Sequence, residues 1–333
     1  MSKRIHVLIN GEQFGPYPET EFRQHLLDRK VLKSDLVWRE GLADWIPAGD
    51  LLATLDATRR QTLFPTPQAV FEQTRAAAAG GDAEKQFLLG LMHDKGEGAP
   101  LNHVEAARLF RQAAAQGHPP ALFQLSLMLA SGQGVLKNDE ESLQCLRQAA
   151  EAGHPEAQYT LAFRQANGQG APRDDAEAVT WFLKAAVQGH AVAQCSLGYM
   201  YENGRGVARD DAEAFRWYRK AAERGDAVAQ NNLGTMLARG QGIGRNEAES
   251  AQWFRKAAEQ GVPGAQTNYG LMLAKGDGVA RDYVEAYRWF SLAADRGHAN
   301  AIKNRDLLVP ELTREQMAEG QKRAAQFVSR KQA

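Results

Sequence analysis

The feature that most constrains this chain is a Gly-x-Gly motif that returns every 36 residues. A nucleotide-binding enzyme uses one or two phosphate loops, and none of these glycines follows an apolar strand or precedes Gly-Lys-Ser/Thr. The spacing therefore predicts a repeat protein in which each motif ends a helix and turns the chain. The six pairs are Gly96/Gly98, Gly132/Gly134, Gly168/Gly170, Gly204/Gly206, Gly240/Gly242 and Gly276/Gly278.

Each repeat has the pattern of two helices on either side of that turn. In the first segment, apolar residues such as Ala193, Leu197 and Met200 recur at helical spacing. The second segment begins at Asn or Asp three residues before a Glu, which predicts a capping box, and it ends at a glycine such as Gly225. The capping pairs are Asn102/Glu105, Asn138/Glu141, Asp174/Glu177, Asp210/Glu213, Asn246/Glu249 and Asp282/Glu285. Trp181, Trp217, Trp253 and Trp289 fall on the apolar face of the second helices and predict packing between helices.

From Ala193 to Gly225 the chain follows A-x-x-x-L-G-x-x-Y-x-x-G-x-G-V-x-x-D-x-x-x-A-x-x-W-x-x-K-A-A-x-x-G almost literally. This pattern resembles the SEL-one-like repeat, a relative of the tetratricopeptide repeat. The resemblance implies a mostly α fold, a right-handed α-solenoid of helix-turn-helix repeats. It also implies a scaffolding role, in which the repeats bind other proteins. Some cysteine-rich bacterial members are linked to β-lactam binding, but the paired cysteines of those members are missing here, where Cys145 and Cys195 stand apart.

Six repeats fill residues 82–297, and we expect a capping element at each end. The repeats are 82–117, 118–153, 154–189, 190–225, 226–261 and 262–297. Residues 66–81, with Thr66 as N-cap and Pro67 at the first turn, predict an N-terminal capping helix. Residues 298–333 predict a partial repeat followed by a polar-faced helix. In that helix Leu312, Met317 and Phe327 are available to cover the exposed end.

Residues 1–54 form a different module, and 55–65 are the expected linker. The order is strand, Asn10-Gly11 turn, strand, short helix and a strand at Leu36–Arg39, so a small α+β domain is predicted. The order G-x-x-x-G-P-Y, then L-V-W-R-E-G-x-x-x-W-x-P-A, resembles the bacterial GYF-like domain (the second GYF family). That resemblance implies a platform for a proline-rich segment, whereas the usual Trp-Tyr pair of the first strand is replaced around His6. Two interpretations stay open, a ligand platform or the core of a small domain, for Gly15, Pro16, Tyr17, Trp38 and Trp45.

In a stacked array of helix pairs, the first helices line a concave groove, and their residues outside the core face a partner. Two such positions per repeat carry apolar or aromatic side chains through the first four repeats. An aromatic row on a groove indicates that a peptide or helix is laid along it. The alternative is that the same residues are buried between repeats. The groove residues are Phe87, Leu91, Phe123, Leu127, Tyr159, Phe163, Cys195 and Tyr199.

The sequence predicts neither catalytic residues nor a bound cofactor or metal. His118, His154, His190 and His298 recur at one repeat position, but stacked repeats separate them by roughly 8–10 Å, too far for shared ligation. We expect them to meet the last carbonyls of the preceding helix. Lys and Arg total 40, as do Asp and Glu, so no net charge attracts nucleic acid or an anionic membrane. The prediction is a cytoplasmic, non-enzymatic scaffold or adaptor for protein partners. Its alternatives are a hydrolase-like or β-lactam-binding protein and a self-associating spacer.

Overall fold

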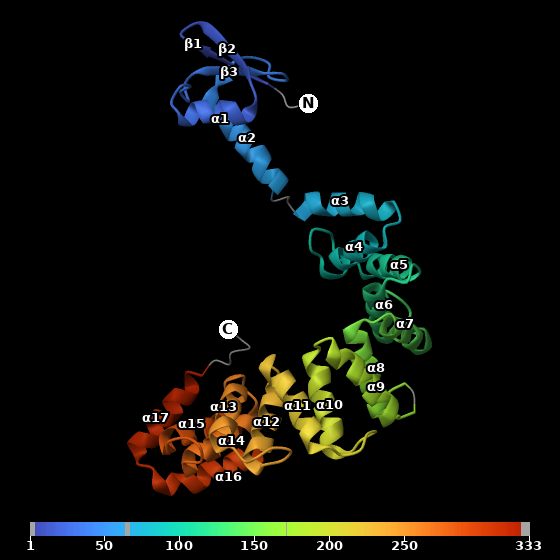
Figure 1. Cartoon of the computed structure of the whole chain (residues 1–333), viewed down its shortest axis with the longest axis vertical. Helices are drawn as coiled ribbons and strands as arrows, with labels where there is room; N and C mark the ends of the chain where they lie inside the picture. Colours follow the sequence, from blue (N-terminus) through green and yellow to red (C-terminus); the bar gives the residue numbers. More distant parts are fainter. Residues whose placement is uncertain (1–3, 64–66, 171, 328–333) are drawn as a thin grey trace. The chain divides into compact units, whose positions relative to one another are not determined.

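The computed structural model describes residues 4–63, 67–170 and 172–327 (Figure 1). The chain divides into two compact units, residues 1–102 and 103–333. Strands occur in the first unit, and the described part of the second is built from helices. The mostly α fold with a small N-terminal α+β module is thereby confirmed.

The first unit begins with a four-stranded antiparallel sheet in the order β2-β1-β3-β4. Its strands are β1 (Ile5–Ile9), β2 (Glu12–Tyr17), β3 (Leu36–Arg39) and β4 (Ile46–Pro47). Asn10 and Gly11 form the turn between β1 and β2 at φ values of 51° and 86°. This is the left-handed geometry that an Asn-Gly hairpin requires, so the predicted hairpin is confirmed.

One face of this sheet packs against two helices, α1 (Glu19–Leu27) and α2 (Ala48–Leu63). Ile5 and Val7 of β1 are buried with Phe22 of α1 and Leu51 of α2. Because successive side chains of a strand point to opposite faces, Ile5 and Val7, which are two residues apart, share the buried face. Because α2 continues to Leu63, residues 55–63 of the expected linker are helical.

Two more helices complete the first unit, α3 (Pro67–Ala79) and α4 (Ala83–Lys95), and they pack against each other. α3 is the helix expected before the first repeat, although its predicted N-cap, Thr66, lies outside the described residues. Asp82 caps α4, because its carboxylate accepts a hydrogen bond from the amide of Lys85 at 3.0 Å.

The second unit is a solenoid in which each helix of the repeats packs on the next along the chain. The second helices of the repeats are α5 (His103–Ala114), α7 (Asp139–Glu151), α9 (Asp175–Val187), α11 (Asp211–Glu223), α13 (Glu247–Glu259) and α15 (Tyr283–Ala294). The first helices are α6 (Pro119–Ser131), α8 (Pro155–Asn167), α10 (Ala191–Asn203), α12 (Ala227–Arg239) and α14 (Pro263–Lys275). After them come α16 (Ala299–Leu308), the 3-10 helix η1 (Val309–Glu311) and α17 (Arg314–Ala325).

Within a repeat, a small residue on the first helix lets the second approach closely. A Cβ added to Gly198 would lie 2.8 Å from the ring of Tyr218, and one added to Gly270 would lie 2.8 Å from the ring of Phe290. Repeat two uses serines instead, and the Ser142 hydroxyl donates to the Ser126 carbonyl at 2.7 Å. In the repeats that contain Gly198, Gly234 and Gly270, an aromatic ring of the second helix thus packs directly on the glycine of the first.

In four of the six motifs the second glycine makes a contact between repeats that the sequence pattern did not predict. A Cβ on Gly206 would lie 2.1 Å from the carbonyl oxygen of Asp175, the first residue of the preceding second helix. Gly134, Gly242 and Gly278 lie equally close to the same helix position one repeat earlier. The motif thus joins neighbouring repeats as well as turning the chain. Gly170 is different, since an added Cβ there would meet nothing within 4 Å.

Half of the predicted capping box is present at the second helices. The Asp174 side chain accepts from the Glu177 amide at 2.9 Å, and Asp282 accepts from Glu285 in the same way. The reciprocal half was predicted wrongly, because the N-cap amide is already used: Asp174 N donates to the Gln165 carbonyl of the first helix. The Glu side chain bonds elsewhere, as Glu177 does to Trp181 Nε1 at 3.3 Å.

α17 covers the end of the solenoid. Leu312 is buried in the core of the last repeat, and Met317 and Phe327 pack against it, as expected. The ring of Phe327 meets that of Trp289 edge-on with centroids 5.6 Å apart. Apolar surface that a next repeat would bury is thereby shielded from water.

Candidate functional site

The predicted groove residues of the second unit fall into two classes. Leu127, Phe163 and Tyr199 occupy the same position on successive first helices and stay exposed, at 39, 43 and 46%. Phe123 and Tyr159, one turn earlier, are half-buried. Exposed large apolar side chains in one row are the kind of surface that marks an interaction site. We call Leu127, Phe163 and Tyr199 the apolar row.

Two other predicted positions, Phe87 and Leu91, lie on α4 in the first unit, where both are half-buried. Cys195 is buried at 8% exposure and so is not itself an exposed groove residue. The structure therefore brings together only some of the predicted residues.

The recurring histidines cap the helix that follows them, which corrects the predicted contact with preceding carbonyls. Nδ1 of His118, His154 and His190 accepts the backbone N–H three residues on, at 3.2, 3.2 and 3.1 Å. An imidazole that accepts at Nδ1 carries its single proton on Nε2. Burial, the main cause, lowers the pKa of His154 and of His190, which keeps both rings neutral. His298 makes no such cap, and its Nδ1 lies 2.9 Å from Thr267 Oγ1.

Two of these imidazoles also stack on aromatic groove residues of the preceding repeat. Phe123 and His154 have ring centroids 5.0 Å apart and planes at 30°. Tyr159 and His190 lie closer, at 4.8 Å and 20°. We call these the ring–imidazole pairs. They explain why Phe123 and Tyr159 are half-buried, since each ring helps to hold two repeats together.

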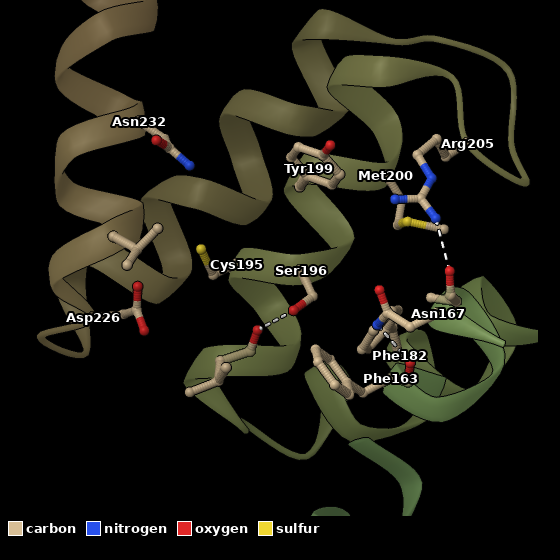
Figure 2. Close-up of a pocket in the computed structure, with 13 residues that line it drawn as sticks. Phe163, Asn167, Phe182, Cys195, Ser196, Tyr199, Met200, Arg205, Asp226 and Asn232 are labelled. Atoms are coloured by element: carbon tan, nitrogen blue, oxygen red, sulfur yellow. Dashed lines mark hydrogen bonds between the residues drawn. The ribbon is translucent and has the colours of Figure 1, made fainter. Parts of the chain in front are cut away.

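A cavity of about 320 Å³ opens between α8, α9, α10 and the start of α12 (Figure 2). Its walls are mainly apolar, and three predicted residues, Phe163, Cys195 and Tyr199, contribute to them. The cavity thus continues the apolar row into the protein. It is lined by Phe163, Ala166, Asn167, Phe182, Val192, Cys195, Ser196, Tyr199, Met200, Arg205, Asp226, Val228 and Asn232.

Charged groups stand at two places in this cavity. Arg205 is tied to the preceding repeat, donating to Asp175 at 2.8 Å and to the Ala166 carbonyl at 2.9 Å. The two arginines that bind Asp175, Arg173 and Arg205, hold the pKa of its carboxyl well below the usual range. Asp226 caps α12 by accepting from the Ala229 amide at 2.7 Å.

Several lining residues were missed by sequence reasoning. Val192 and Val228 occupy equivalent positions in their repeats, where other repeats have Pro120 or Glu156. A comparison of the repeats at this position could have identified the two valines. Phe182 and Arg205 come from a second helix and a turn. Their place at the cavity depends on how repeats stack, which no local pattern reports.

Burial also affects the ionisable groups near Cys195. Burial, with Asp226 next to it, raises the pKa of the Cys195 thiol, which therefore stays protonated. Such a thiol is a poor nucleophile. Among the residues that the structure describes, no group of three His, Cys, Asp or Glu side chains is placed to hold a metal ion. In the same part of the chain, no helix has the length and apolar character to cross a membrane.

In the N-terminal module, the predicted platform residues lie in different places. Trp38 shares the outer face of the sheet with His6, its partner on β1, and the two rings are 5.8 Å apart. Tyr17 packs against the core instead, with its ring edge-on to His25 at 4.8 Å. Trp45 precedes β4 and is half-buried. Gly15 and Pro16 lie in β2 beside the irregular register with β1.

Comparisons with known proteins agree with this architecture. The Sel1 repeat model matches six segments, 84–118, 119–154, 155–190, 191–226, 227–262 and 263–298. The GYF domain 2 model matches residues 6–52. No curated protein matches the chain.

Two solved structures are similar over most of this chain. A Sel1 repeat protein from Oxalobacter formigenes is 27% identical with a TM-score of 0.58, covering 73% of this chain and 94% of its own. The protein c5321, a protective antigen of uropathogenic Escherichia coli with an SLR fold, is 29% identical with a TM-score of 0.55. That alignment covers 78% of this chain, which spans 64% of c5321.

Sel1 repeat proteins are in general protein-interaction scaffolds and are typically non-catalytic. The repeat model covers more than half of the present sequence, in phase with the helix pairs of the structure. This chain is a member of the Sel1 repeat family and carries a GYF domain 2 at its N-terminus.

Proposed function

We propose that this protein is a non-enzymatic adaptor that holds a peptide or helix of a partner protein on the face formed by its first helices. The observation that supports this most directly is the apolar row, Leu127, Phe163 and Tyr199, which leads into the cavity. Three large apolar side chains that are partly exposed to water on successive first helices cost free energy unless a partner covers them. Repetition at one helix position also suits a ligand that runs along the array.

The test is capture of partners from a lysate of the source organism by the immobilised full chain. Replacing Leu127, Phe163 and Tyr199 by Ala should abolish capture and leave the helical circular dichroism intact, because these side chains are exposed. The matched control replaces Leu136, Leu183 and Val187, which are exposed apolar residues away from the apolar row. Equal loss in both variants would contradict a specific role for the row.

The N-terminal module is the second recruitment site in this proposal. His6 and Trp38 give the outer sheet face an aromatic centre, and Leu36 beside them is exposed. An extended segment can dock on such a face. Linking two weak sites in one chain raises the effective concentration of each partner near the other.

A full-chain variant with Leu36→Ala and Trp38→Ala should lose a set of captured proteins different from the set lost by the apolar-row variant. If both variants lose the same set, the two surfaces act as one site and the adaptor mechanism is wrong.

A further inference from the structure

At two junctions between repeats, a residue of one repeat contacts a residue of the next. At the following junction, where the cavity lies, both of these positions hold different residue types. At the two earlier junctions a ring stacks on a histidine 31 residues later, as Phe123 does on His154 and Tyr159 on His190. One repeat further on, the same two positions hold Cys195 and Asp226. A thiol and a carboxylate therefore replace an aromatic ring and an imidazole.

This replacement accounts for the empty space. Cys195 and Asp226 both line the cavity of about 320 Å³, on α10 and at the start of α12 (Figure 2). The cavity lies at the small end of the range of about 300–1,000 Å³ that is typical of ligand pockets, which leaves room for one large side chain. In the ring–imidazole pairs the equivalent space is filled by an aromatic ring, so the volume left empty beside Cys195 is that of a ring.

The remaining walls suit an aromatic occupant. Phe163 and Tyr199 line the cavity with half-exposed rings, and Val192 and Val228 add aliphatic surface. Aromatic rings gain stabilisation from edge or offset contacts with other rings beyond that of their buried area. An aliphatic side chain would fill the space without that gain.

Charge complementarity selects among aromatic side chains. Asp226 makes no ion pair in the described part of the chain, and its carboxylate borders the cavity. A carboxylate attracts the positive edge of a ring and accepts from an N–H donor. The neighbouring Cys195 thiol is protonated and does not repel a ligand that approaches Asp226. An indole offers both the ring and the N–H.

We propose that this cavity binds a tryptophan side chain of the partner segment, with its ring between Phe163 and Tyr199 and its indole N–H donating to Asp226. The inference rests on the proposed function and names the anchor residue of that partner. Tryptophan is among the residues that carry most binding energy at protein interfaces.

The first test uses the unmodified full chain and three small probes in ligand-observed NMR titrations. N-acetyl-tryptophanamide should bind roughly fivefold or more tightly than its 1-methylindole analogue, which lacks the N–H donor, because a hydrogen bond to a charged acceptor is lost. N-acetyl-leucinamide should bind more weakly than both. Equal affinity of the three probes would overturn the proposal.

The second test refills the cavity with groups that the protein already uses. The double substitution Cys195→Tyr with Asp226→His recreates the pair seen between Tyr159 and His190, so it should fold and should abolish binding of N-acetyl-tryptophanamide. Cys195→Ser, which stays small, is the matched control and should retain binding. Undiminished binding by a folded double variant would overturn the proposal. If that variant does not fold, the comparison with the 1-methyl analogue on the native chain decides.

The two proposals fail in different ways. Capture that depends on the apolar row, together with equal binding of the three probes, would leave the adaptor role standing and remove the tryptophan anchor.

Discussion

Two junctions of the solenoid, α7–α8 and α9–α10, occupy equivalent places in the repeat but are packed differently. At α9–α10, Gly206 lies against the backbone of Asp175, and Met200 is buried. At α7–α8 a Cβ added to the equivalent glycine, Gly170, would meet nothing within 4 Å, and Arg164 stands where the other repeats of the second unit have Met. A cavity of about 490 Å³ lies between these helices, lined by Arg164, Gly170 and the acidic start of α7.

The ion pairs at the two junctions differ as well. Arg205, between the two glycines of its motif, bridges to Asp175 and to the Ala166 carbonyl. The equivalent of Arg205 at α7–α8 is Gln169, which is exposed, and the equivalent acid, Asp139, pairs only with Lys137 among described residues. A repeat can therefore keep its helices and its turn while it loses the contacts that join it to its neighbour.

The largest expected effect comes from a methyl group at the two equivalent glycines. Both have positive φ, 68° at Gly206 and 80° at Gly170, so Ala should cost about 1–2 kcal/mol of backbone strain at either position. Only Gly206→Ala also forces Cβ against the Asp175 carbonyl, which adds about 1–3 kcal/mol of overpacking. Urea denaturation should therefore show a clearly larger loss of unfolding free energy for Gly206→Ala. Equal losses would mean that the α9–α10 contact contributes nothing.

The next effect is stabilising and repairs the looser junction. Arg164→Met restores the residue that is buried as Met128 and Met200 in neighbouring repeats. Burial of a Met side chain is worth about 1.5–3 kcal/mol, and we expect about 1 kcal/mol here because Arg164 already buries part of its stem. Arg164→Gln removes the charge without adding apolar surface and serves as the control. A gain of equal size from Gln would show that charge, and not packing, weakens the junction.

A smaller effect tests the ion pair. Gln169→Arg should let residue 169 reach Asp139 and raise the stability of the α7–α8 junction by roughly 0.5 kcal/mol, as surface pairs do. Arg205→Gln should lower stability at α9–α10 by more, because Arg205 also binds a backbone carbonyl. Thermal melts in low and in 1 M salt would separate the contributions, since only the ionic part is screened. A gain for Gln169→Arg that persists at 1 M salt would argue against an ion pair.

The smallest effect concerns pH and should leave the comparison unchanged. Burial lowers the pKa of His154 and His190 below the ordinary value of about 6.5. The unfolded chain then binds more protons than the folded one, so stability is fully present above pH 6.5 and is lost as pH falls through the folded-state pKa values. Melting temperatures from pH 7.5 to 5 should fall alike for Gly206→Ala and Gly170→Ala.

The control for this pH effect uses a residue that the protein already has at the same position. Asp226 caps α12 as the histidines cap α8 and α10. A variant with His154→Asp and His190→Asp should keep the caps and lose most of the fall between pH 7.5 and 5. An unaltered fall would place the titrating groups elsewhere.

Local chemistry made much of this fold predictable. The Asn10-Gly11 hairpin, the helix starts at Asp174 and Asp282 and the helix ends at the motif glycines all depend on hydrogen bonds within a few residues. Such contacts recur wherever the same short pattern recurs, so the pattern predicts them. The six repeats could be counted for the same reason.

The short patterns missed one contact between distant residues, the close approach of Gly206 to Asp175. They also missed two local hydrogen bonds: the Trp181 indole donates to Glu177 in place of the reciprocal cap, and His154 caps the helix that follows it. A capping-box glutamate has no reciprocal partner once the first helix has taken the N-cap amide, and a short pattern cannot show that competition.

The candidate site divides in the same way. The sequence pattern identified Phe163, Cys195 and Tyr199 as site residues, because the first-helix positions recur with the 36-residue period. Only the packing of the repeats showed that Phe123 and Tyr159 are half-buried against histidines, and that a cavity opens where Cys195 and Asp226 replace such a pair. A period fixes which residues are equivalent, whereas the space between them depends on the size of the side chains that neighbouring repeats bring together.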